Sequence, residues 1–238
     1  MKISVALAAY KGEQYIAEQI QSILNELGEN DELIISDDYP EGKTFGVIKE
    51  FIAEDKRIRY VEGPRKGVIK NFENALNACT GDVIFLSDQD DVWLPGKVEA
   101  IMNEIENGAD LVLHDASVTD AKLNITEPSY FAIHGSNNSF VKNIIKNSFV
   151  GCCMAFTKEV MNESLPFPRK LPMHDWWIAL LAIKKRRKVV LLDKPFILWR
   201  RHGDNVTGGK TSAYQKIIWR LRILLSLAFP ICAFGKEK

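Results

Sequence analysis

The chain has 238 residues, 46% of them hydrophobic and 26% charged, which is typical of one α/β domain with at most a small appendage. Lys plus Arg and Asp plus Glu both number 31, so the net charge of zero gives no electrostatic reason to bind nucleic acid. The four cysteines match no metal or redox spacing, which favours buried or free thiols in a reducing cytoplasm. There is no convincing secretory signal and no apolar run of about 18 residues, so we expect a cytoplasmic chain without a spanning helix.

The first half alternates between apolar runs and segments with helical spacing. The apolar runs predict strands at 3–9, 33–36, 58–61, 83–86 and 111–113. The helical spacing predicts helices at 13–27, 45–52, 68–78 and 97–105. This alternation predicts a mostly parallel sheet with helices on both faces, whose ligands bind beyond the carboxyl ends of the strands.

The second half is less regular. Residues 124–148 are polar and loop-like, and 165–172 contain three prolines, which indicates a rigid connector. The remaining expectations are a strand or tight turn at 149–157, a helix at 174–183, strands at 189–192 and 196–200, and a glycine-containing loop at 203–210.

The C-terminal tail, 211–238, differs from the rest of the chain. Its apolar residues recur at helical spacing, with Lys216, Arg220 and Arg222 between them. One interpretation is a basic amphipathic helix lying on the inner face of a cytoplasmic membrane. The other is a helix packed on the domain or on a second subunit, and the residues alone leave both open.

Acidic residues follow three of the predicted strands, as Asp37 and Asp38, as Asp88, Asp90 and Asp91, and as Asp115. Mg²⁺ and Mn²⁺ prefer carboxylate oxygens, and in an extended chain Asp88 and Asp90 point to the same side. A divalent cation there neutralises a departing diphosphate. An Asp-rich surface turn is the alternative.

Three further groups carry candidate chemistry. Asp37 and Asp38 provide acceptors for a base N–H or a ribose hydroxyl, or else they form a helix cap or a turn. Asp175, beside His174, is a candidate base for a sugar hydroxyl, and Trp176 and Trp177 offer faces for a sugar ring. A helix cap with core tryptophans explains the same residues.

Residues 200–205, at the end of the last predicted strand, combine arginines with His202. Neutral His is a common metal ligand, and the planar guanidinium of Arg201 suits phosphate. A solvated basic turn is equally consistent with the spacing.

Six segments together resemble family 2 glycosyltransferases with the GT-A fold, and most of all the rhamnosyltransferase-like branch of bacterial surface-polysaccharide synthesis. The resemblance runs from residue 1 to about 210. The segments are Ala8–Leu24 (AAYKGEQYIAEQIQSIL), Ser36–Asp38 (SDD), Phe85–Val98 (FLSDQDDVWLPGKV), Gly151–Phe156 (GCCMAF), His174–Trp177 (HDWW) and Trp199–Gly208 (WRRHGDNVTG).

The resemblance implies an inverting transfer from a nucleotide-diphosphate sugar, such as dTDP-rhamnose or a UDP-sugar, to a glycan or lipid-linked glycan. It implies a GT-A domain at 1–210, with a nucleotide-sugar half at 1–115 and an acceptor half at 116–210. The implied roles are metal binding through Mn²⁺ or Mg²⁺ at Asp88, Asp90 and His202; donor binding at Ala9, Tyr10, Asp37, Asp38, Asp88, Gln89 and Arg201; base catalysis at Asp175; and acceptor binding at His174, Trp176 and Trp177.

Residues 39–42 depart from the family pattern, which usually continues with Gly-Ser after the paired acids. This departure affects which nucleotide base the donor site is expected to prefer.

Two other functions remain open. A nucleotidyltransferase also gathers acids around a metal, but it needs a phosphate loop richer than Lys11-Gly12. A non-catalytic sugar-nucleotide or glycan-binding module explains the acids and tryptophans without turnover. We expect the tail either to contact a membrane or to form a homodimer.

Overall fold

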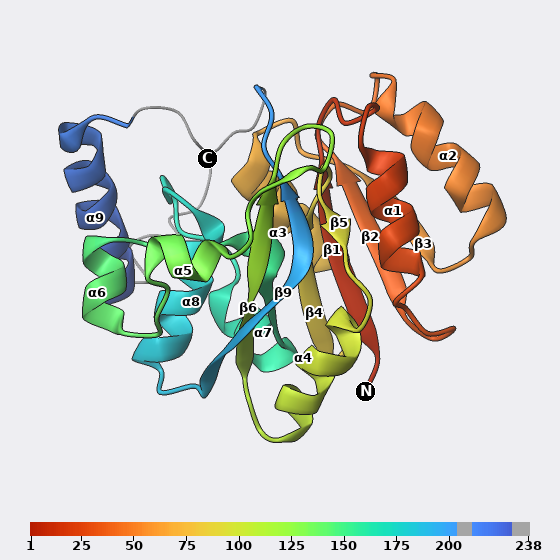
Figure 1. Cartoon of the computed structure of the whole chain (residues 1–238). Coiled ribbons are helices and arrows are strands. Elements are labelled where there is room, and N and C mark those ends of the chain that lie inside the picture. The colour runs from red at the N-terminus through yellow and green to blue at the C-terminus, as the bar shows by residue number, and fades with distance from the viewer. Residues whose placement is uncertain (204–210, 230–238) are drawn as a thin grey trace.

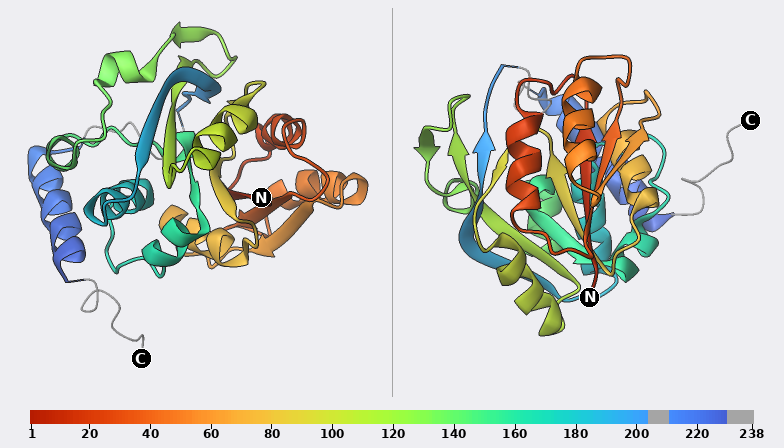
Figure 2. Two further views of the ribbon diagram at one scale, coloured as in Figure 1. Left: turned by 90° about the horizontal axis from the view of Figure 1, so that it is seen from below. Right: turned by 90° about the vertical axis from the view of Figure 1, so that its right-hand side faces the viewer.

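The computed structural model describes residues 1–203 and 211–229, and it contains one curled, nine-stranded mixed sheet with helices on both sides (Figures 1 and 2). The strand order is β3-β2-β1-β4-β8-β6-β9-β5, and β7 pairs with β6. The strands are β1 (Ile3–Ala9), β2 (Glu32–Asp37), β3 (Ile58–Glu62), β4 (Val83–Asp88), β5 (Val92–Trp93), β6 (Leu111–Thr119), β7 (Ile125–Glu127), β8 (Met154–Thr157) and β9 (Val189–Arg200).

The helices divide between the two faces of this sheet. Those of the first half are α1 (Ile16–Leu24), α2 (Thr44–Glu54), α3 (Val68–Ala78) and α4 (Lys97–Glu106). Those of the second half are α5 (Tyr130–His134), α6 (Phe140–Ile145), α7 (Lys158–Ser164), α8 (His174–Lys184) and α9 (Ala213–Ala228). A 3₁₀ turn at Gly151–Cys153 precedes β8.

Alternation along β1 shows how the two cores form. Val5 and Leu7 join the core under α1, α2 and α4, whereas Ala6 and Ala8 join the core under α3, α7, α8 and α9. Successive side chains of a strand point to opposite faces, so a continuous apolar run such as β1 indicates a strand buried on both sides. Every residue of β1 is buried.

The sheet is parallel only over β3, β2, β1 and β4, together with the β6–β9 pair. Strand β8 runs antiparallel to both β4 and β6, and β5 runs antiparallel to β9. The predicted α/β class is confirmed. The sheet is less parallel than predicted, because β8, from the second half of the chain, lies antiparallel between β4 and β6.

Several local expectations for the second half were wrong. The region predicted as a loop at 124–148 contains β7, α5 and α6, and the two strands predicted at 189–192 and 196–200 are the single strand β9. The short helices α5 and α6 are capped at their N-termini by Ser129 and Ser139, whose hydroxyls accept from the amides of Ala132 and Lys142. Such caps stabilise helices too short for periodicity to reveal.

Cys79, Cys152 and Cys153 are buried free thiols, as expected, and Cys232 lies outside the described residues. Among the described helices, none has the length and apolar character to cross a bilayer.

Candidate active site

The acids after β2 and β4 meet at one edge of the sheet because both strands flank β1. The pairing register sets Asp88 beside Ala8 and Asp37 beside Ala9. Parallel strands end at a common edge, which gathers these side chains although they are far apart in sequence.

Asp88, Asp91 and the thiol of Cys152 form the most crowded part of this edge. One potential ligand atom from each lies within 4.8 Å of the others. Burial, and then the charges of neighbouring carboxylates, raise the pKa of Asp88 well above its usual value and that of Asp91 to about 7. Oδ2 of Asp91 is buried and has no hydrogen-bond partner among the described residues. Carboxylates crowded in this way, with an unpaired oxygen, fit a site for a hard divalent cation.

Asp90 lies against His202, which is the last predicted metal ligand. Nε2 of His202 is 2.7 Å from Oδ2 of Asp90, and the imidazole ring packs on Tyr15 with 4.8 Å between ring centroids. Asp90 and His202 are separated by more than 100 residues, so this pairing brings two of the predicted metal ligands together.

Arg200 holds the end of β9 to the acidic segment. Its backbone amide donates to Oδ1 of Asp91 at 3.0 Å, and its Nε donates to the carbonyl of Asp90 at 2.7 Å. The guanidinium also pairs with Glu18 and lies 4.7 Å from the centre of the Tyr15 ring. Arg200, which the sequence did not single out, therefore contacts this segment through both its backbone and its side chain.

The side chain of Arg201 packs on Trp199. Its guanidinium lies 4.9 Å from the centre of the Trp199 ring, and its backbone amide donates to Thr119. Its assignment to the donor remains a prediction.

Gln89 joins the acidic segment to the loop after β1. Its side-chain oxygen accepts from the amide of Tyr10 at 2.8 Å, and its side-chain nitrogen donates to the carbonyl of Tyr10 at 2.9 Å. A Cβ added at Gly12 would stand 2.1 Å from Oε1 of Gln89, so a larger residue there would displace the Gln89 side chain. The two-way contact fixes the backbone of one predicted donor-binding loop against the other.

The Tyr10 ring is half exposed and stands near Tyr39, with 6.0 Å between ring centroids. The Lys11 ammonium lies 5.2 Å and 5.0 Å from the centres of these two rings. A partly exposed aromatic pair with a cation is a suitable surface for a planar, negatively charged ligand such as a nucleotide.

The carboxylate of Asp38 accepts hydrogen bonds from backbone amides. Oδ1 accepts from the amides of Arg65 and Lys66, and Oδ2 accepts from the amide of Gly67 at 2.7 Å. Asp37 is fully buried and accepts from the amide of Tyr39. Burial raises its pKa. Both acids therefore shape the loops at the edge, and direct contact with a nucleotide stays a prediction.

Asn71 of α3 is a positioning residue that the sequence reasoning missed. Its side-chain nitrogen donates to the carbonyls of Ala9 and Ser36 at 2.9 Å each, and its oxygen accepts from the Ser36 hydroxyl. The residue ties the ends of β1 and β2 together. A polar residue on an otherwise apolar helix face was the available signal.

Asp175, in the first turn of α8, faces the same edge from the second half of the chain. Its charge contributes to the raised pKa of Asp88, and a Cβ added at Gly151 would stand 3.6 Å from Cβ of Asp175. Burial raises the pKa of Asp175 to about 6, against opposing hydrogen bonds from the amides of Trp176 and Gly151. A carboxylate with this pKa is ionised at neutral pH and basic enough to take a proton.

The neighbours of Asp175 are core residues. The indole nitrogen of Trp176 donates to the carbonyl of Asn143, and that of Trp177 donates to the carbonyl of Ser164. Both rings are almost fully buried. The two tryptophans thus pack in the core, which was the alternative interpretation of these residues. Their contact with an acceptor stays a prediction, and no exposed ring face supports it.

His174 is also buried, stacked on Phe72 with 4.1 Å between ring centroids. Burial lowers its pKa to about 3, so the imidazole is neutral. Its predicted role toward the acceptor has no support from exposure. Asp115 likewise serves structure, because its carboxylate accepts from the amides of Ala116 and Phe131 and so anchors α5.

Lys97 is a buried cation behind the acids that the sequence pattern did not reveal. It is 1% exposed, and its ammonium donates to the carbonyl of Cys152 at 3.1 Å and lies 3.9 Å from the centre of the Trp93 ring. Burial lowers its pKa to about 8. Its charge partly offsets that of Asp91.

Comparisons with known proteins agree with this arrangement. The family model for glycosyl transferase family 2 matches residues 4–165, which is more than half of the chain. The chain is 27% identical over 232 residues to the dTDP-rhamnosyl transferase RfbG of Shigella flexneri, and the match covers 88% of this chain and 76% of that protein.

Two solved structures share the fold at low sequence identity. The chain resembles S. aureus TarS 1–349, in complex with UDP-GlcNAc, with a TM-score of 0.73 and 15% identity over 94% of this chain and 67% of that one. It resembles the mannosyltransferase PcManGT from Pyrobaculum calidifontis, in complex with GDP-Man and Mn²⁺, with a TM-score of 0.62 and 14% identity over 99% of this chain and 76% of that one. The sheet, the acids at its edge and the family match lead to one conclusion: the chain belongs to glycosyltransferase family 2 and has the GT-A fold.

Proposed function

We propose that the chain is an inverting, metal-dependent hexosyltransferase that moves a sugar from a nucleotide-diphosphate donor to a hydroxyl of a glycan or lipid-linked glycan. The observation that carries the proposal is the approach of Asp175 to the acidic segment Asp88–Asp91. The carboxylates at the end of β4 suit a cation and diphosphate, and the carboxylate of Asp175 comes near them from the first turn of α8.

Asp88, Asp90, Asp91 and His202 would hold Mn²⁺ or Mg²⁺. Their oxygen and imidazole donors suit either ion, and the buried, unpaired oxygen of Asp91 is the kind of group that a cation satisfies. The Mn²⁺ in the PcManGT complex supports the same choice. When bound, the cation would neutralise charge on the diphosphate leaving group.

Asp175 would act as the base. Its carboxylate would take the proton of the acceptor hydroxyl as the acceptor oxygen bonds to the anomeric carbon. The bond from that carbon to the diphosphate oxygen breaks with its electron pair leaving on the nucleoside diphosphate. Attack from the side opposite the leaving group inverts the anomeric configuration. The neutral His174 beside it would keep the site free of a competing cation.

The nucleotide would lie along Ala9, Tyr10 and the loops held by Asp37 and Asp38. Gln89 would set the position of Tyr10 by its two hydrogen bonds. The similarity to a dTDP-rhamnosyl transferase supports dTDP-rhamnose as donor, and the UDP-GlcNAc complex of TarS supports a UDP-sugar. Tyr39, which stands where the family usually has glycine, would contact the base or ribose beside Tyr10.

We also propose the division into a donor half at 1–115 and an acceptor half at 116–210, joined through β6, which spans the boundary. The tail at 211–238 would add α9 to the acceptor half. We propose a cytoplasmic location, with donor and acceptor as the partners.

Product analysis tests the reaction class. With a panel of dTDP- and UDP-sugars and Mn²⁺, we expect free nucleoside diphosphate and a sugar of inverted anomeric configuration on the acceptor, read by NMR. Release of pyrophosphate would instead identify a nucleotidyltransferase. Donor binding without donor hydrolysis or transfer in every condition would identify a binding module.

A further inference from the structure

Helix α9 presents an apolar face to solvent. Tyr214, Ile217, Leu221 and Leu225 recur at helical spacing along one side and are 73%, 51%, 51% and 59% exposed. The opposite side of the helix packs into the core through Ile223 and Leu227, which are almost fully buried. The exposed face is thus not the side that holds α9 to the domain, and packing does not explain its composition.

Helix α6 lies beside α9 and extends this surface (Figures 1 and 2). Val141 and Ile145, one turn apart, are 65% and 61% exposed. The Arg220 guanidinium of α9 donates to the carbonyl of Ile145, which joins the two helices directly. Apolar residues gathered on two adjoining helices mark an interaction site more strongly than scattered surface residues do.

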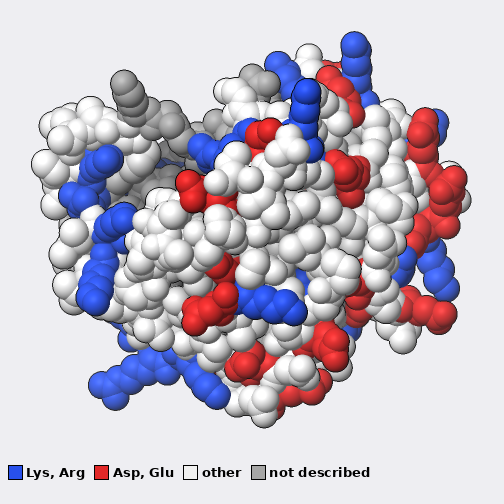
Figure 3. Space-filling model, viewed as in Figure 1, with Lys and Arg blue, Asp and Glu red and all other residues white. Residues whose placement is uncertain are grey.

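The charge of this region is one-sided although the whole chain is neutral. Neither 128–158 nor 211–229 contains an Asp or Glu. The basic residues on the two helices and at the end of α6 are Lys142, Lys146, Lys216, Arg220 and Arg222. In Figure 3 the described residues of the left-hand lobe, where α9 lies, include Lys and Arg and no Asp or Glu on the visible face.

We propose that α6 and α9 form a docking surface for the anionic headgroups and adjoining acyl region of a lipid bilayer. Exposed aliphatic residues flanked by Lys and Arg are complementary to an interface that is apolar below and negative above. A second copy of this chain fits less well, because a symmetric dimer through this face would bring two basic surfaces together.

The surface adjoins the helix that carries the base. The carbonyl of Asn143 in α6 accepts from the indole of Trp176, the residue after Asp175. Docking through α6 and α9 would therefore hold α8 near the bilayer. This step rests on the proposed function, and it assigns the acceptor to the class of glycans anchored to lipid.

Vesicle flotation of the full chain tests the surface. We expect binding to phosphatidylglycerol–phosphatidylcholine vesicles at low salt, and weak binding to phosphatidylcholine alone. The double substitution K216Q/R222Q should lower the partition coefficient about 25-fold, because each basic residue near an anionic surface contributes on the order of 1 kcal/mol. The double substitution L221E/L225E should abolish binding.

Ile125→Glu is the matched control, since Ile125 is 58% exposed on β7, away from α6 and α9. It should bind vesicles like the parent chain. Circular dichroism of each variant verifies folding. Three results would overturn the docking surface. They are no binding of the parent chain at low salt, equal binding to both vesicle types, and a loss of vesicle binding in I125E equal to that in L221E/L225E. A concentration-dependent dimer that L221E/L225E dissociates would overturn it in favour of a subunit interface.

The measurement is independent of the proposed reaction because vesicle binding needs neither donor nor acceptor. Absence of vesicle binding by the parent chain, together with sugar transfer to a soluble acceptor, would remove only the docking surface. Vesicle binding with no transfer to any acceptor would remove only the proposed function.

Discussion

The Asp175 side chain allows base catalysis to be separated from donor binding. Asn keeps an oxygen that accepts from the Trp176 amide, as Asp175 does at 2.7 Å, but it cannot take a proton. We expect Asp175→Asn to lower kcat by about 100- to 10,000-fold, the usual contribution of a general base, with donor affinity unchanged. Steady-state kinetics and calorimetric titration of donor measure the two effects. Exposed Asp193→Asn is the matched control, and native turnover in Asp175→Asn would exclude the base assignment.

The raised pKa of Asp175 predicts how turnover responds to pH. The base acts in its ionised form, and its pKa is about 6, so kcat/KM should fall about tenfold for each pH unit below 6 and level off above about 7. The acidic limb should be absent from the residual activity of Asp175→Asn. A profile flat from pH 5 to pH 8 would contradict the prediction.

Asp90 links the acidic segment to His202, and its removal should affect metal and donor together. We expect Asp90→Ala to lower kcat/KM at least 100-fold, because charge stabilisation by a bound cation contributes several kcal/mol. Mn²⁺ should no longer improve donor binding, which titration with and without the ion reports. Unchanged Mn²⁺ dependence would move the metal site away from Asp90.

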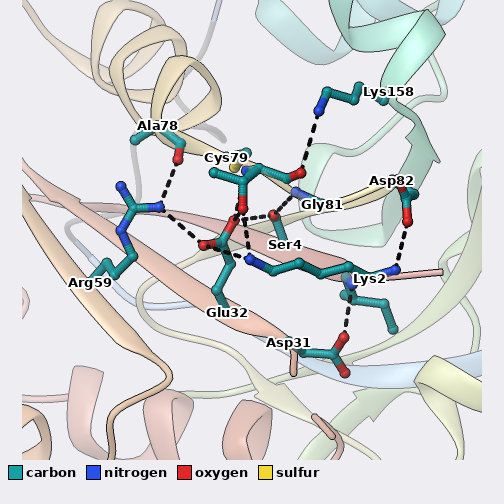
Figure 4. A network of polar contacts seen from close by, with 12 residues as sticks. Lys2, Ser4, Asp31, Glu32, Arg59, Ala78, Cys79, Gly81, Asp82 and Lys158 are labelled. Atoms are coloured by element: carbon teal, nitrogen blue, oxygen red, sulfur yellow. Dashed lines mark hydrogen bonds and ion pairs between the residues drawn. The ribbon is translucent and has the colours of Figure 1, made fainter. Parts of the chain in front are cut away.

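At the scale of elements, the starts of β1 and β2 are held by a network around Glu32 (Figure 4). Its carboxylate accepts from the hydroxyl of Ser4 at 2.6 Å and from the amide and hydroxyl of Thr80, and it pairs with Lys2 and Arg59. Burial opposes ionisation, but the hydrogen bonds outweigh it and lower the pKa of Glu32 to about 2. The network lies at the ends of the strands remote from the acidic segment.

Glu32→Gln should therefore lower the free energy of unfolding by roughly 2–3 kcal/mol at pH 7 with little change in donor affinity. The carboxylate stabilises the fold fully above the pKa of the unfolded chain, near 4.5, and this contribution disappears as pH falls through that value towards 2. Urea unfolding at pH 7 and at pH 3 measures the difference between parent and variant. Exposed Glu29→Gln should have no effect, and an equal loss at both pH values would refute the assignment.

The elements of the first half could be predicted because their patterns are local. Helix α3 has the predicted bounds, and Asp88 to Asp91 lie at the end of β4, where acids were expected. The contacts that assemble the site are not local. The two-way hydrogen bonding of Gln89 with Tyr10, and the bonds of Arg200 to Asp90 and Asp91, join segments whose spacing in sequence carries no period. The burial of Lys97 could not be predicted, because a charged side chain usually indicates a surface position.

For the whole molecule, ligand binding and stability are linked. A donor nucleotide with Mn²⁺ that binds only the folded chain adds about 2.7 kcal/mol at a concentration 100 times its Kd. A domain of this size should then gain about 5–10 °C in Tm. A thermal-shift screen of nucleoside diphosphates with and without Mn²⁺ measures this and identifies the base. Asp90→Ala should lose the Mn²⁺-dependent part, and a screen without any shift would contradict donor binding.

The bonds from Arg200 have a consequence for synthesis of the chain. The ribosome releases Asp90 and Asp91 more than 100 residues before the arginine that fixes them, and β9 must add to the sheet beside β6 for that arginine to arrive. A nascent chain can complete the parallel strands β1 to β4 early, but Arg200 cannot hold its acidic segment until translation has passed residue 200. Folding of the acidic segment thus depends on a strand that is translated after β1, β2 and β4 are complete.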